Sequence, residues 1–275
     1  TDTFTAQTVT RGTAGKEKTD TVLNIQNITA DNGSDNSIID SSDGNVITTG
    51  SGNDTIYLWH GGKDTIDAGS GTNTLDFTQA SSAITIDLKE GTGKVGSDAI
   101  TVTNMHNIVG TNSNSSINAH PELANYLTGD SNENTFQIEN STGKWSYLVG
   151  NGGKDTFNVS SKDNVHVNIG IDINDTSGDT LTCSDDYGSI DGHTQFYLYN
   201  SQSDDVDWKS HISISDDNQS ILYTNGNKVT TLISQDNGGT GCDNFVKKEV
   251  FCNTSDNSSD IDKTWKPRYQ TSQTV

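Results

Sequence analysis

Apolar residues recur along the first third of the chain at a nearly constant spacing. They are separated by steps of nine, nine, ten and nine residues and comprise Ile38, Ile47, Ile56, Ile66 and Leu75. An Asp or Asn stands two positions before each, at Asn36, Asn45, Asp54, Asp64 and Asn73. A period of nine does not fit the helical repeat of 3.6, but it accommodates one short strand and one tight turn. The pattern therefore predicts a solenoid of short strands around a narrow apolar core.

A second, looser series follows downstream. Its apolar residues are spaced by ten, nine, twelve and nine and comprise Ile117, Leu127, Phe136, Leu148 and Phe157. The residues two positions earlier are again polar: Ser115, Asn125, Asn134, Ser146 and Asp155. We expect a second block of the same solenoid, with less regular turns.

From about residue 165 the period of nine gives way to simple alternation. Apolar residues at every second position between Val165 and Ile173 predict a half-buried strand, and 194–200 and 211–215 have the same character. Within 220–234, Asn225-Gly226 separates two strand-like runs, which is a strong hairpin signal. We expect antiparallel strands that cap the end of the solenoid.

Glycine and acidic residues at fixed repeat positions indicate a cation. The clearest copies are GSGNDTIYL from Gly50, GGKDTID from Gly61, GSGTNTLDF from Gly69 and VGNGGKDTFNV from Val149. Glycine permits positive φ and close approach of the backbone, while turn carbonyls and carboxylates are hard oxygen donors that suit Ca²⁺ better than Mg²⁺ or Zn²⁺. The candidate ligand residues are Asp54, Asp64, Asp155, Asn36, Asn45 and Asn73, with turn residues Gly50, Gly52, Gly62, Gly69, Gly71 and Gly153.

These copies fit the nonapeptide GGxGxDxUx, in which U is a large apolar residue. On this basis 30–160 resembles the RTX (repeats-in-toxin, hemolysin-type) family of secreted bacterial proteins. The resemblance implies an all-β fold, a calcium-loaded parallel β-roll in two blocks with C-terminal antiparallel strands and hairpins. The expected divisions are an N-terminal segment with a cap strand, a first repeat block, a strand connector, a degenerate second block and an antiparallel C-terminal cap: 1–29, 30–79, 80–110, 111–160 and 161–275.

In such a roll successive repeats alternate between two edges, so the resemblance implies ions between turns two repeats apart. Asp54 would then stack between Asn36 and Asn73, and Asp64 over Asn45. Each pair offers a single carboxylate. Asn retains an oxygen ligand but carries no charge, and stacked Asn side chains can also hydrogen-bond to one another without metal. The number of calcium sites therefore stays open.

Composition suggests how such a chain would be stabilised. The formal net charge is −21, 31 of the 37 acidic residues are Asp, and only 29% of residues are hydrophobic. With so few apolar residues, the burial of apolar surface does little to offset the loss of chain entropy on folding. An ion that neutralises the turns would therefore contribute folding free energy directly. We expect calcium binding to be coupled to folding. The charge also disfavours nucleic acid and anionic membranes as direct partners.

The resemblance implies a non-enzymatic calcium-binding module of a secreted toxin, adhesin or exported enzyme. Such a module would act in virulence outside the cell or at its surface, with Ca²⁺ as cofactor and a cell-surface glycan or host protein as candidate partner. The sequence contains neither HExxH nor GxSxG, which argues against an included zinc protease or lipase. No apolar segment approaches the length of a membrane span, and the first 27 residues lack the apolar stretch of a signal peptide.

Two other functions fit parts of the pattern. A polysaccharide-active enzyme or carbohydrate binder on a parallel solenoid would use Asp54, Asp64 and Asp155 with the adjacent Lys63 and Lys154. An ice-binding or surface solenoid would instead use rows of threonine, for which the repeat supplies Thr48, Thr55, Thr65 and Thr74. Threonine is also simply a favourable strand residue.

Three cysteines complete the candidate chemistry. A disulfide between Cys242 and Cys252 would close a short loop in a chain that reads as extracellular, and would leave Cys183 free or intermolecular. Alternatively, all three are small apolar residues that fill space. Neither CxxC nor nearby histidine spacing favours a zinc site.

Overall fold

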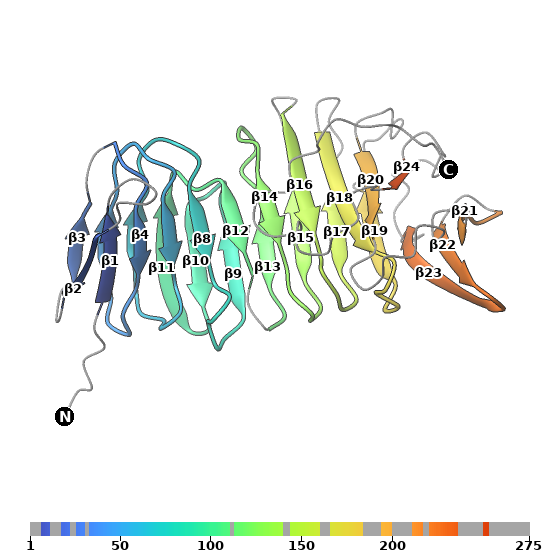
Figure 1. Ribbon diagram of the computed structural model, residues 1–275, viewed down its shortest axis with the longest axis horizontal. Coiled ribbons are helices and arrows are strands. Elements are labelled where there is room, and N and C mark those ends of the chain that lie inside the picture. The colour runs from blue at the N-terminus through green and yellow to red at the C-terminus, as the bar shows by residue number, and fades with distance from the viewer. Residues whose placement is uncertain are drawn as a thin grey trace.

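The computed structural model is an elongated roll formed almost entirely of strands, most of them parallel (Figure 1). It describes residues 7–11, 18–22, 26–30, 33–110, 113–139, 144–159, 166–183, 194–199, 211–216, 220–235 and 250–252. The all-β, parallel solenoid predicted from the sequence is confirmed. None of the described residues forms a helix long and apolar enough to cross a membrane.

The strands form two sheets. In spatial order, the first sheet contains β2 (Lys18–Val22), β1 (Gln7–Arg11), β4 (Ser37–Ile39), β6 (Thr55–Tyr57), β8 (Thr74–Asp76), β12 (Asn107–Val109), β14 (Tyr126–Thr128), β16 (Trp145–Val149), β18 (His166–Asp172), β20 (Thr194–Tyr199) and β24 (Val250–Cys252). The second contains β21 (Ile212–Ile214), β22 (Ser220–Asn225), β23 (Lys228–Gln235), β19 (Asp179–Cys183), β17 (Thr156–Val159), β15 (Thr135–Ile138), β13 (Ser116–Asn118), β9 (Ile84–Asp87), β10 (Thr92–Val95), β11 (Asp98–Thr103), β7 (Thr65–Asp67), β5 (Val46–Thr48) and β3 (Asn27–Thr29).

Successive repeats alternate between these sheets, as the RTX resemblance implied. In the first sheet Ile38, Ile56 and Leu75 occupy equivalent positions of parallel strands, and in the second Ile47 pairs with Ile66. All five apolar side chains are at most 1% exposed. Nine residues therefore move the chain to the opposite sheet, and about eighteen return it to the same one.

A hairpin insertion joins the two repeat blocks without interrupting the second sheet. Strand β11 pairs in parallel with β7, β9 pairs in parallel with β13, and β10 lies antiparallel between them. Because the insertion contributes three strands to one sheet, the alternation resumes in phase at β12 and β13.

The C-terminal region differs from the expectation that antiparallel strands begin near residue 161. Strands β18, β19 and β20 all continue the parallel pairing, and among the described residues after 161 antiparallel pairing involves β21, β22 and β23 alone. The expectation was wrong because alternation of apolar residues indicates a half-buried strand but not the direction of its partner. The hairpin at Asn225-Gly226 is confirmed, with Asn225 opposite Lys228.

The core is a narrow seam between the sheets. Phe136 and Phe157, from neighbouring strands, are fully buried and stack with ring centroids 5.3 Å apart. A second inward residue often follows two positions after the first, such as Leu58 after Ile56. Each short repeat strand of the two repeat blocks thus buries only one or two apolar side chains, so the hydrophobic contribution of one such repeat is small.

Replacing Phe157 with Ala is expected to lower the free energy of unfolding by about 3–5 kcal/mol, because a fully buried ring is removed from the seam. The control Asn158→Ala alters the outward-facing neighbour and should change stability by about 0.5 kcal/mol or less. Urea denaturation followed by circular dichroism measures both. Equal losses would show that this seam is not the main apolar core.

Candidate metal centre

At most repeats the side-chain oxygen of the polar residue accepts a hydrogen bond from the turn two repeats earlier. The backbone N–H of Asn36 donates to Oδ1 of Asp54 over 2.8 Å, and the N–H of Asp54 donates to Oδ1 of Asn73 over 2.9 Å. On the other edge, the N–H of Asn45 donates to Oδ1 of Asp64 over 2.8 Å. The stacking expected for these five residues is therefore present in the structure.

The second block continues the same ladder. The N–H groups of Ser115, Asn134 and Asp155 donate to Oδ1 of Asn134, Asp155 and Asp179 at 3.1, 2.7 and 3.0 Å, respectively. These side chains are at most 5% exposed. Buried backbone N–H groups require an acceptor, and a short side chain ending in oxygen supplies it. Asp, Asn and Ser all satisfy this requirement.

The second polar atom distinguishes Asp from Asn. At the Asn positions it is a donor that reaches a turn carbonyl: Nδ2 of Asn36 donates to Ser34 O over 2.8 Å, and Nδ2 of Asn134 donates to Asn132 O over 2.8 Å. At Asp54, Asp64 and Asp155 it is an acceptor, and among the described residues Oδ2 of each is buried without any hydrogen-bond partner. Each Asp thus presents an acceptor where equivalent Asn residues present a donor. Such an oxygen requires a proton or a cation.

The electrostatics of Asp64 and Asp155 agree with this requirement. Burial raises the pKa of Asp64 to about 7. Burial, followed by the nearby charge of Asp179, raises the pKa of Asp155 to about 9, and burial raises the pKa of Asp179 to about 7. Desolvation disfavours the charged form of each group. A bound cation would reverse this preference.

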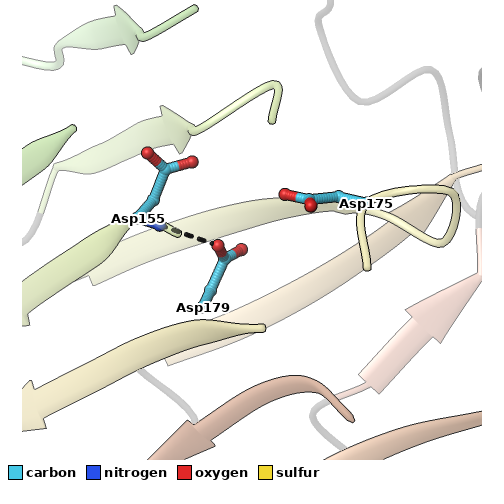
Figure 2. A group of neighbouring side chains, drawn as sticks. All are labelled: Asp155, Asp175 and Asp179. Carbon is cyan, nitrogen blue, oxygen red and sulfur yellow. Dashed lines mark hydrogen bonds between the residues drawn. The ribbon is translucent and has the colours of Figure 1, made fainter. Parts of the chain in front are cut away.

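Three carboxylates converge at the C-terminal end of the ladder (Figure 2). Asp155 precedes β17, Asp179 begins β19, and Asp175 points toward both from the turn that follows β18. One oxygen of each lies within 4.8 Å of the other two. Two oxygens on one Ca²⁺ can be no more than about 5 Å apart, since each bond is about 2.3–2.6 Å long. This acidic triad can therefore hold a single metal ion.

Repulsion among the ionised carboxylates of the triad destabilises the folded protein unless a counter-charge is bound. Two full negative charges 4.8 Å apart repel by about 3 kcal/mol at an effective dielectric constant of about 20. Asp155 is fully buried and Asp179 is 4% exposed, so solvent screens the pair poorly. The group must bind protons or a cation at neutral pH.

The sequence predicted Asp155 but missed Asp175 and Asp179. Asp179-Thr180-Leu181 repeats the Asp-Thr-apolar signature of Asp155-Thr156-Phe157. This signal was hidden because the interval between the two aspartates is 24 residues, compared with 19 between Asp54 and Asn73. The longer turn supplies Asp175, for which the repeat pattern gives no signal.

The predicted glycines lie in the stacked turns. Positive φ values between 65° and 110° occur at four of them, Gly62, Gly69, Gly71 and Gly153. At Gly52 the constraint is close approach, because a Cβ would overlap the carbonyl oxygen of Ser34 in the preceding turn. Gly50 lies opposite Gly69, and its carbonyl accepts the N–H of Ser70 over 3.0 Å. Their role in holding an ion remains a prediction.

Other candidate residues do not form a common site. Lys63 and Lys154 are exposed whereas the neighbouring aspartates are buried, so they do not present a joint acidic and basic surface. The threonines do not form one row: Thr55 pairs with Thr74 in the first sheet, but in the second Thr48 pairs with Asp67 and Thr65 pairs with Val46.

His60 lies in a turn between repeats and contacts Asp40. The ring Nδ1 of His60 lies 2.9 Å from Oδ1 of Asp40, a buried residue at an inward position, so this histidine fastens one turn to another. The proposed Cys242 to Cys252 disulfide lies outside the described residues, because Cys242 is not among them.

Comparisons with known proteins give no relationship from which to infer function. No protein-family model matches this chain, and no curated protein matches it. The candidate metal site is therefore supported by the geometry of its own residues alone.

In metal-free protein, the free energy of unfolding is expected to fall as pH rises from about 4 to about 9. Unfolded Asp titrates near pH 3.9, whereas the folded pKa is about 7 for Asp64 and Asp179 and about 9 for Asp155. The stability contributed by the protonated carboxyls is complete below the unfolded pKa and is lost as pH rises through the folded pKa. Urea titrations in chelator at several pH values measure this, and Asp155→Asn should flatten the upper part. Stability that rises over this range would contradict the assignment.

Proposed function

We propose that this chain is a non-enzymatic calcium-binding β-roll module that becomes fully stable only when Ca²⁺ is bound. The observation that carries the proposal is that Oδ2 of Asp54, Asp64 and Asp155 is buried with no hydrogen-bond partner in the part of the chain that the structure describes. These three are the repeat positions at which the glycine-rich turn is followed by Asp rather than Asn. Asn would accept the backbone N–H of the stacked turn equally well, as Asn73 does. The Oδ2 atom of each Asp is therefore not needed for stacking, which supports a role as a metal ligand.

The donor set favours calcium over other metals. The ladder positions contribute carboxylate, amide and hydroxyl oxygens, and the stacked turns contribute backbone carbonyls, with neither His nor Cys beside the three aspartates in the repeat. Ca²⁺ accepts six to eight oxygens in a flexible arrangement, whereas Mg²⁺ demands an octahedron and Zn²⁺ prefers nitrogen and sulfur. The ion would supply positive charge to Oδ2 and so allow each Asp to ionise within the roll.

Binding and folding are expected to be coupled because the ladder joins residues distant in sequence. Asp54 bonds to Asn36, eighteen residues before it, and Asp64 bonds to Asn45, nineteen residues before it. Such a site does not exist in the unfolded chain, so the free energy of ion binding becomes free energy of folding. A net charge of −21 adds to the repulsion that the ion relieves.

The similarity of the repeat to the RTX nonapeptide supports a secreted or cell-surface protein. Calcium outside the cell is abundant, so a chain of this type would fold after export. The parent protein would be a toxin, an adhesin or an exported enzyme, and a host protein or surface glycan would be its target. Each of these assignments extends the proposal of calcium binding and depends on it.

Asp54→Asn and Asp64→Asn should each weaken calcium binding and reduce the rise in melting temperature that calcium causes. Asn keeps an oxygen to accept the backbone N–H of the stacked turn, as it already does at Asn73, and removes only the charge. Isothermal titration with CaCl₂ and calorimetric melting measure both effects. The control is Asp87→Asn, because Asp87 accepts the N–H of Glu90 in a turn outside the ladder.

Two results would oppose the proposal. If the unmodified protein binds no calcium at millimolar concentration, the module is a metal-free scaffold. If Asp64→Asn stabilises the protein equally with and without calcium, the carboxylate is a burial defect and not a ligand.

A further inference from the structure

We propose that Asp155, Asp175 and Asp179 form one cation site. It contains three carboxylates where the repeat positions have one, and it stabilises the pairing of the C-terminal hairpin β22–β23 with the roll. This inference rests on the proposed function, since it assumes that the chain binds Ca²⁺. It goes further by assigning two ligand residues that the nonapeptide pattern does not include and by giving the site a mechanical role.

Charge sets this site apart from the others. At Asp54 and Asp64 the stacked partners are Asn side chains, so the ladder itself contributes one carboxylate at each position. In the triad three carboxylates lie within 4.8 Å of one another. Affinity for Ca²⁺ increases with the number of charged ligands, so this site should bind more tightly than the other two.

A second observation indicates that the triad is more than a cluster of surface acids. Asp155 is fully buried, its Oδ1 accepts the N–H of Asn134 over 2.7 Å, and its Oδ2 has no partner among the described residues. Figure 2 shows the carboxylate of Asp175 directed toward this residue and Asp179. A buried carboxylate with an unsatisfied oxygen, within 4.8 Å of two further carboxylates, is an arrangement that a cation would complete.

The turn that carries Asp175 is built to hold it in place. Oδ1 of Asp172 accepts the N–H of Asn174 over 3.0 Å, and the N–H of Asp175 donates to the carbonyl of Asp172 over 3.0 Å. Oδ1 of Asp175 then accepts the N–H of Ser177 over 2.9 Å. These bonds fix one oxygen of Asp175 and orient the carboxylate before any ion binds.

The same turn leads directly into the strand that joins roll and hairpin. Asp179 opens β19, which pairs with β17 on one side and with β23 on the other, where Asp179 lies opposite Ile233. Gly178 has a φ of 75°, and a Cβ there would lie 3.3 Å from the carbonyl oxygen of Thr231 in β23. An ion between Asp155, Asp175 and Asp179 would therefore fix the edge on which β23 pairs.

The decisive variant is Asp175→Asn, which keeps an oxygen for the N–H of Ser177 and removes only the charge. Equilibrium dialysis against CaCl₂ should show one ion fewer, or affinity for that ion reduced at least about tenfold. Hydrogen exchange should show that calcium no longer slows exchange in β23, while protection of β6 and β8 persists. Asp179→Asn, which also keeps its acceptor for the N–H of Asp155, should act in the same way.

Comparison variants separate the possible failures. Asp64→Asn should lose a different ion and retain calcium protection of β23, and Asp87→Asn should behave as the unmodified protein. If the unmodified protein binds no calcium, both proposals fail. If it binds calcium but Asp175→Asn retains the full number of ions at unchanged affinity, the triad is not a site and calcium binding elsewhere stands. If the ion is lost and protection of β23 is unchanged, the proposed link to the hairpin is wrong.

Discussion

The roll depends on buried side-chain oxygens that accept backbone N–H groups from the turn two repeats earlier. In the two repeat blocks each short strand buries only one or two apolar side chains, so the hydrophobic effect alone provides little to align one repeat over the next. The ladder supplies alignment because a short polar side chain at a fixed position reaches only the turn directly beside it. At Asp54, Asp64 and Asp155 the second oxygen is left buried with no hydrogen-bond partner among the described residues. The stacking of this protein and its demand for a counter-charge therefore have the same origin.

This dual role explains why the ladder positions alternate in identity without disturbing the fold. Asn and Ser meet the backbone requirement and leave no charge, whereas Asp meets it and leaves one. A roll made only of Asn would be satisfied without metal, and one made only of Asp would be unstable without it. The mixture in this chain gives a scaffold with a few positions at which the proposed ion would affect stability. Those positions lie near its N-terminal end and at its junction with the C-terminal hairpin.

Much of the fold could be predicted because one period fixes both spacing and direction. The apolar series from Ile38 to Leu75 predicted which side chains are buried, and the RTX resemblance implied alternation between two sheets. The direction of β18 to β20 could not be predicted, because the alternation of apolar residues is the same in parallel and antiparallel strands. Asp179 was missed because the longer turn that carries Asp175 places it 24 residues after Asp155, outside the repeat spacing. Whether an Asp only accepts a backbone N–H or could also bind a metal ion depends on the surroundings of its Oδ2 atom. The sequence gives no information on those surroundings.

The most direct test of this account is a crystal structure determined in millimolar CaCl₂, with anomalous scattering used to locate calcium. The account predicts ions bonded to Oδ2 of Asp54, Asp64 and Asp155 at about 2.4 Å, with Asp175 and Asp179 sharing the ion at Asp155. It would be contradicted if the turns stack as described while these oxygens carry protons or bind only water at neutral pH.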